Sequence, residues 1–195
     1  MATVQVAMNR TRTSILACCF SIGMTGMMAI LAPVAARADE PSPHPGVGGH
    51  VGVATPVVTL SSDKTTFISD QFTLAHPIGI GFKLSDKLAI DFEMVLGNPI
   101  HPRGTTSLVV DPGVVYNMGS VVIGLRLAWK VQSDTNFGLI PLIHKGIFDL
   151  GDGATWFVEA AFPTFLSAGV DATKTPPADK TTFELNVVLH TGIGF

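Results

Sequence analysis

Isolated charged residues interrupt several long apolar runs in this chain, and their spacing places them on single faces of extended segments. Asp91 and Glu93 are two residues apart, so both would point to the same side of a strand. Charges gathered on one enclosed face can neutralise one another as buried ion pairs, or can select ions where the face lines a hydrated channel. The residues that we assign to this predicted charge cluster are Asp91, Glu93, Asp111, Arg126, Lys145 and Glu159 at about mid-strand, and Lys130, with Glu184 and His190, nearer the strand ends.

Catalytic and metal-binding motifs are a second class of chemistry to consider. The patterns GxSxG and HExxH and a phosphate-cradling glycine loop do not occur in the chain. His101 and Ser107 flank one predicted loop, but the close pair of His and Ser on one strand face that a lipid-modifying enzyme would use is missing. His44 and His50 are spaced too loosely to indicate a metal site. We therefore expect no enzyme activity, no catalytic residue, no cofactor and no metal ligand.

The elements that must position the charges are strands, because apolar residues recur at every second position. No stretch after residue 38 shows the apolar spacing of an amphipathic helix. Eight alternating segments are predicted at about 49–61, 71–84, 88–100, 105–118, 121–132, 137–150, 154–167 and 181–195. Most are longer than an ordinary globular strand and long enough for a tilted strand to cross a bilayer. Short connections at 85–87, 119–120 and 151–153 alternate with longer and more polar ones, as in a membrane barrel.

The two faces of these segments differ in size and charge. In 71–84 the residues from Phe72 to Leu84 that share one side are bulky, and those between them are small. A charge on the lipid-facing side of a membrane barrel costs about 2–4 kcal/mol, which assigns the bulky face to the outside and the charges to the interior. Two segments are less clear: Pro56 predicts a bulge in the first, and Lys145 and Asp149, which share a face of 137–150, are assigned to the interior.

The N-terminal residues predict export. Arg10 and Arg12 precede a nearly uncharged stretch that finishes in Ala36-Arg37-Ala38, so residues 1–38 are interpreted as a cleaved signal peptide; the alternative is a permanent membrane helix. Residues 39–48 are a Pro- and Gly-rich flexible lead-in, and 49–195 form the barrel domain. Both cysteines fall within the signal peptide. Its removal takes three of 12 basic residues and none of 15 acids, leaving a formal net charge of −6 that argues against a nucleic-acid partner.

The last segment, Phe183–Phe195, alternates up to an aromatic final residue. This pattern resembles the signal that the outer-membrane assembly machinery recognises, and the eight segments with unequal loops resemble small OmpA-type and OmpX-type barrels. The resemblance covers about residues 49–195 and implies an all-β fold, an eight-stranded antiparallel up-and-down transmembrane β-barrel. It also implies a bacterial outer-membrane location, contact with outer-membrane lipid, Phe195 as the assembly signal, the assembly machinery as a partner and a monomeric state.

Three functions remain open from the sequence. The favoured one is an integral outer-membrane barrel with a structural, adhesive or narrow solute-permeation role. The alternatives are an outer-membrane lipid-modifying enzyme and a secreted soluble barrel that binds a hydrophobic ligand, similar to lipocalins in topology. Because eight strands leave little free bore, an ion-paired plug is favoured over a selectivity constriction for the predicted charge cluster.

Overall fold

Strands are the only regular elements among the described residues. The computed structural model describes residues 46–131, 136–171 and 178–195, and these residues form ten strands and no helix. The strands are β1 (Val47–Ser61), β2 (Thr65–Phe67), β3 (Phe72–Lys83), β4 (Leu88–His101), β5 (Ser107–Asn117), β6 (Val122–Lys130), β7 (Asn136–Gly151), β8 (Ala154–Ala161), β9 (Thr164–Asp171) and β10 (Ala178–Gly194). Within the described residues, no helix is long and apolar enough to span a membrane. The predicted signal peptide and most of the predicted lead-in lie outside them.

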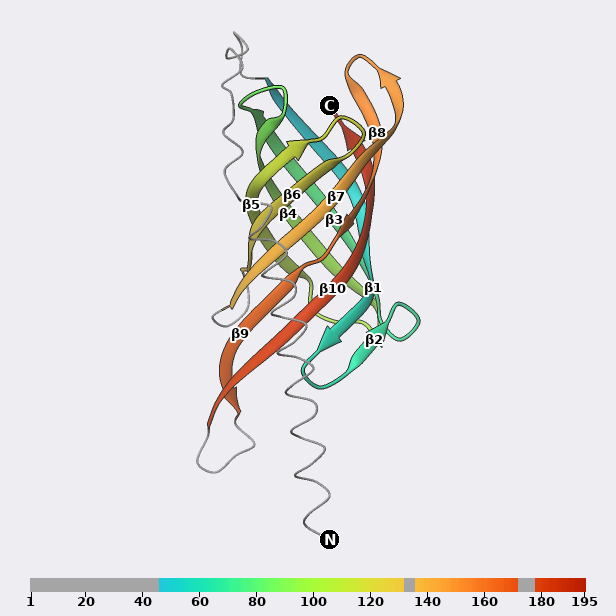
Figure 1. Ribbon diagram of the computed structural model, residues 1–195. Helices are drawn as coiled ribbons and strands as arrows, with labels where there is room; N and C mark the ends of the chain where they lie inside the picture. Colours follow the sequence, from blue (N-terminus) through green and yellow to red (C-terminus); the bar gives the residue numbers. More distant parts are fainter. Residues whose placement is uncertain (1–45, 132–135, 172–177) are drawn as a thin grey trace. The chain divides into compact units, whose positions relative to one another are not determined.

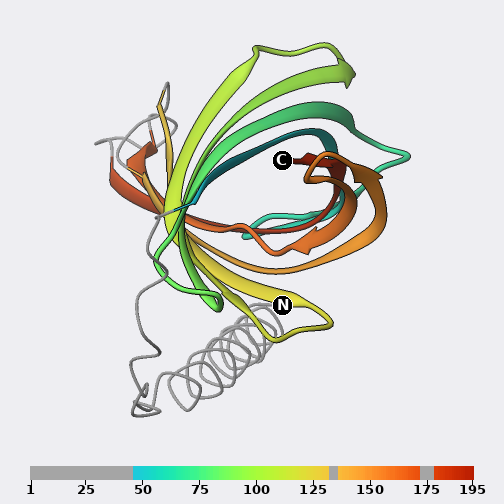
Figure 2. The ribbon, with the colours of Figure 1, turned by 90° about the horizontal axis from the view of Figure 1, so that it is seen from above.

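The strands close into an antiparallel barrel (Figures 1 and 2). Neighbouring strands pair in the order β1, β3, β4, β5, β6, β7, β8 and β10, and β10 returns to pair with β1. The backbone closes the ring with two hydrogen bonds between Gly49 and Phe195, with N···O distances of 2.7 and 2.9 Å. The predicted eight-stranded antiparallel barrel is therefore confirmed as a fold.

One of the eight positions is shared by two short strands. The prediction of a single segment over 154–167 is wrong in detail, because β8 ends at Ala161 and β9 begins at Thr164. Pro163 lies in the gap and has no N–H to give to a neighbouring strand. Backbone hydrogen bonds still join this gap to the strands on either side. The N–H of Phe162 donates to Pro141 O on β7 (2.9 Å), and the N–H of Asn186 on β10 donates to Pro163 O (2.8 Å). The break therefore leaves the barrel closed.

The connections differ between the two ends of the barrel. The turn end carries the tight β3–β4, β5–β6 and β7–β8 turns together with the start of β1 and the end of β10. Gly119 and Gly151 have φ values of 94° and 86° there, a conformation that favours glycine. The loop end carries the other four connections, as the alternation of lengths predicted. The small hairpin in which β2 pairs with β1 was not predicted; it lies in the first of these loops.

Large apolar residues cover the outside, whereas the interior holds small residues, charged residues and a few large apolar ones. Along β3, Ala75 and Pro77 are buried, whereas Ile78 and Ile80 are 47% and 50% exposed. The face assignments predicted for this segment and for the residues around Asp91 and Glu93 are confirmed. The bulge predicted at Pro56 is also confirmed, since the pairing of β1 with β10 shifts between Pro56 and Val58.

Candidate functional site

The barrel interior contains a buried guanidinium group that is surrounded by carboxylates. Arg126 of β6 is 3% exposed, and its Nη2 lies 2.5 Å from Asp91 Oδ2. Its Nε donates to the same oxygen at 2.7 Å, and its Nη1 donates to Glu93 Oε1 at 3.1 Å. Glu159 Oε1 lies 3.7 Å from Nη1. One cation therefore joins carboxylates from β4 and β8 across the bore.

Strand register explains how Arg126 reaches β4 although β5 lies between. Asp91 pairs with Gly113 on β5, and Gly113 pairs with Arg126, so the three residues form one row across three strands. A Cβ at Gly113 would collide with the Cα and Cγ atoms of Arg126. The glycine therefore leaves the space through which the arginine side chain passes to Asp91.

A second row uses the same arrangement for a histidine. His50 of β1 pairs with Gly79, which pairs with Glu93, and a Cβ at Gly79 would overlap the His50 ring. Across this glycine His50 Nε2 lies 2.6 Å from Glu93 Oε2. Glu93 is thus held from two sides, by His50 and by Arg126.

Two further histidines flank the carboxylate of Glu159. His144 of β7 and His190 of β10 are its register neighbours, with Nδ1 atoms 3.6 and 3.3 Å from its oxygens. Phe157, which is almost fully buried, packs against all three histidine rings at centroid distances of 4.4 to 6.0 Å. We call the following eight residues the interior cluster: His50, Asp91, Glu93, Asp111, Arg126, His144, Glu159 and His190.

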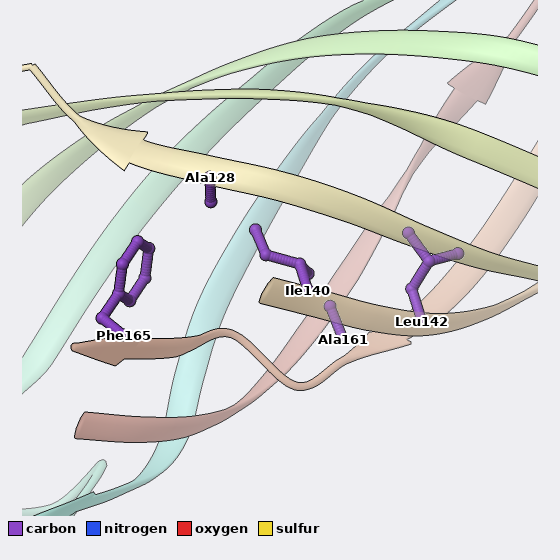
Figure 3. Packing of buried hydrophobic residues seen from close by; sticks show 5 residues of the cluster. All are labelled: Ala128, Ile140, Leu142, Ala161 and Phe165. Carbon is purple, nitrogen blue, oxygen red and sulfur yellow. The ribbon is translucent and has the colours of Figure 1, made fainter. Parts of the chain in front are cut away.

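Asp111 differs from the other acids of the interior cluster. It is 1% exposed, and neither carboxylate oxygen has a hydrogen-bond partner. It lines a cavity of about 110 Å³ that also contacts Arg126, Glu159 and His190. Ile140, Ala161 and Phe165 also line the cavity. They belong to an apolar cluster with Ala128 and Leu142, whose side chains converge from β6, β7, β8 and β9 (Figure 3).

Five members of the predicted charge cluster lie together as expected, and Lys130 lies nearer a strand end, also as expected. The five are Asp91, Glu93, Asp111, Arg126 and Glu159. Lys130 is nearer the loop end, where its Nζ lies 3.0 Å from Glu184 Oε1 and 4.4 Å from the centre of the Phe165 ring.

The interior assignment of Lys145 is wrong. Lys145 is exposed and pairs with Val158, an outward residue, while the neighbouring His144 faces Glu159. The reason is strand alternation, because Ile140, Leu142 and His144 share the inward face of β7 and Lys145 falls on the other face.

The histidines were the main omission from the predicted charge cluster. His50 was assessed only as a metal ligand, His144 was not considered, and His190 was placed near a strand end. His101 and Ser107 are exposed at the loop end, on β4 and β5. Among the described residues, no group of three or more His, Cys, Asp or Glu side chains is arranged to hold a metal ion.

The structure thus defines the protein as a closed antiparallel β-barrel with an apolar exterior and an ion-paired interior. No protein-family model and no curated protein matches the chain.

Substitution of Lys130 tests how far the contribution of an interior ion pair to stability depends on its burial. The side chains of Lys130 and Glu184 are 25% and 36% exposed, so water screens their attraction. We expect Lys130→Met to lower the free energy of unfolding by less than about 1 kcal/mol, as for other partly exposed pairs. Urea titration followed by tryptophan fluorescence measures the change. A loss of several kcal/mol would show that this pair is as isolated from water as Arg126.

Proposed function

We propose that the protein is an integral β-barrel of the bacterial outer membrane with a structural or adhesive role. The observation that carries the proposal is that charged and apolar side chains are placed in the opposite way to those of a soluble protein. Charged side chains lie in the interior, and large apolar side chains form the outer surface. In hydrocarbon a closed barrel satisfies every backbone hydrogen bond within the protein, which an open sheet cannot do.

The outer apolar band supports this proposal. Residues more than 40% exposed occur on strands all around the ring: Val51, Ile80, Phe92, Val114, Leu127, Ile143 and Leu189. Soluble monomers rarely expose contiguous apolar patches larger than a few hundred Å². Lipid is therefore the environment that best matches this surface.

Aromatic residues near both ends of the barrel give further support. Trp156 and Phe148 stack at a centroid distance of 5.3 Å near the turn end, where Tyr116 is also exposed. Trp129 and Phe137 meet at 5.9 Å near the loop end. Two such girdles are typical of barrels that cross a membrane, because amphipathic rings favour the interface.

The interior favours a closed bore over an open channel. The carboxylates joined by Arg126 are less than 10% exposed, which is the condition of a plug and not of a hydrated pore. The proposal includes export through a cleaved signal peptide, assembly by the outer-membrane machinery, contact with membrane lipid and similarity to small OmpA-type and OmpX-type barrels. It assigns no catalytic residue and no cofactor.

Heat-modifiability tests the proposal directly. Chain without residues 1–38, refolded into detergent, should migrate as two species on a detergent gel, a compact one before boiling and an extended one after it. The folded chain should also require detergent or lipid to stay in solution, because the outer band is apolar. A folded chain that stays soluble and monomeric in plain buffer would overturn the proposal and favour the soluble ligand-binding barrel.

A further inference from the structure

We infer that the barrel interior contains a binding site for a small primary ammonium ion with a short apolar chain. The inference rests on the cavity that Asp111 lines and on the unpartnered polar atoms of its lining residues. It goes beyond the proposed membrane role, because it depends on the interior of the barrel and not on what surrounds the outside.

The first argument is the state of Asp111. A buried carboxylate normally has hydrogen-bond donors or a counter-charge, because leaving it without partners is costly. Both oxygens of Asp111 lack a hydrogen-bond partner although the side chain is buried. The neighbouring guanidinium of Arg126 is already engaged by Asp91 and Glu93. Asp111 therefore presents two free acceptors to the cavity that it lines.

The second argument does not involve Asp111 and concerns His190. A carboxylate oxygen only accepts hydrogen bonds, so the contact of His190 Nδ1 with Glu159 Oε1 requires the proton on Nδ1. Nε2 of the same ring is buried and also lacks a hydrogen-bond partner. His190 lines the same cavity. Two residues of the cavity lining, Asp111 and His190, therefore each carry a buried polar group without a partner, and the Asp111 carboxyl group fits a ligand that brings N–H donors.

The charge of the interior cluster favours a cationic ligand over a neutral one among ligands with N–H or O–H donors. The interior cluster contains four carboxylates, Asp91, Glu93, Asp111 and Glu159, against the single guanidinium of Arg126. An ammonium group offers both the missing positive charge and three N–H donors, whereas a neutral alcohol offers one donor and no charge.

The rest of the cavity determines the ligand's other end. From Asp111 the lining continues toward the loop end through apolar side chains that include Val109, Ile140, Ala161 and Val188. A volume of about 110 Å³ is somewhat smaller than the roughly 150 Å³ that admits benzene in an engineered protein cavity. The site therefore fits an ammonium head on Asp111 and a chain of a few carbon atoms against the apolar wall.

The test titrates n-propylammonium into the folded barrel and follows the methyl NMR signals of Val109, Ile140, Ala161 and Val188. We expect saturable shifts confined to these methyls, with a dissociation constant on the order of millimolar for so small a ligand. 1-Propanol, which has no charge, and tetramethylammonium, which has no N–H donor, should bind at least about 10-fold more weakly. Equal binding of all three compounds, or the absence of saturable shifts with n-propylammonium, would overturn the inference.

Two matched substitutions locate the head group. Asp111→Asn keeps the shape of the side chain and removes its charge, so it should weaken n-propylammonium binding by at least about 10-fold. Asp86→Asn makes the same change in the exposed β3–β4 turn and should leave binding unchanged. Unaltered binding by a folded Asp111→Asn barrel would remove Asp111 from the site. The titration can be run with or without detergent, so it stays informative if the proposed membrane location fails.

Discussion

Replacing Arg126 by methionine should destabilise the barrel more than any other single change that we predict, by about 3–5 kcal/mol. Methionine keeps much of the side-chain volume of arginine and removes the charge. Asp91 and Glu93 would lose a partner at 2.5 to 3.1 Å, and Glu159 would lose one at 3.7 Å, while remaining buried. A buried carboxylate without a counter-charge carries a large desolvation cost. Urea unfolding of the folded barrel measures the loss.

The matched control is Lys130→Met, which makes the same kind of change at the partly exposed pair with Glu184. A large loss for Arg126→Met beside a small loss for Lys130→Met would support the plug. Adding Glu93→Gln to Arg126→Met should recover part of the loss, because one of the stranded charges is removed. If Arg126→Met leaves stability unchanged, water must reach the interior cluster, and conductance across a planar bilayer should then be measurable.

Much of the fold could be predicted from the sequence because strand alternation is a local property. Ile78, Ile80 and their neighbours alternate with Ala75, Pro77 and Gly79 without interruption, and this pattern requires no knowledge of the partner strands. The hairpin of β2 could not be predicted, because three residues are too few to show a period. The gap at Pro163 was visible as a proline, but its effect depends on which neighbours supply the missing hydrogen bonds.

The site was less predictable, because it depends on register between strands. Nothing local indicates that His50 lies across Gly79 from Glu93, or that His144 and His190 flank Glu159. The glycines give the only sequence signal, since a small residue between two polar ones leaves room for them to meet. The rule that charges face inward also fails at Lys145, because strand alternation gives the inward position on β7 to His144.

The proposed membrane location predicts that arginine on the outer face destabilises the barrel in proportion to its depth in the bilayer. Met94 lies at the middle of β4 and is 43% exposed on the apolar outside. We expect Met94→Arg to cost about 2–4 kcal/mol in lipid vesicles, because the charge would lie near the bilayer midplane. The two side chains are similar in length, so packing changes little. Equilibrium unfolding in vesicles, followed by the fluorescence of Trp129 and Trp156, measures the cost.

Met118 supplies the control, since the same substitution there places the charge beyond the end of β5. Met118 is 60% exposed in the β5–β6 turn, where its N–H donates to Val121 O at 2.9 Å. At this depth an arginine should cost only about 0–1 kcal/mol. In water, by contrast, both substitutions would fall within about 0.5 kcal/mol, as exposed changes usually do. The difference in unfolding free energy between Met94→Arg and Met118→Arg therefore reports whether lipid surrounds the outer face. Two equally small costs would contradict the proposal that lipid surrounds this barrel.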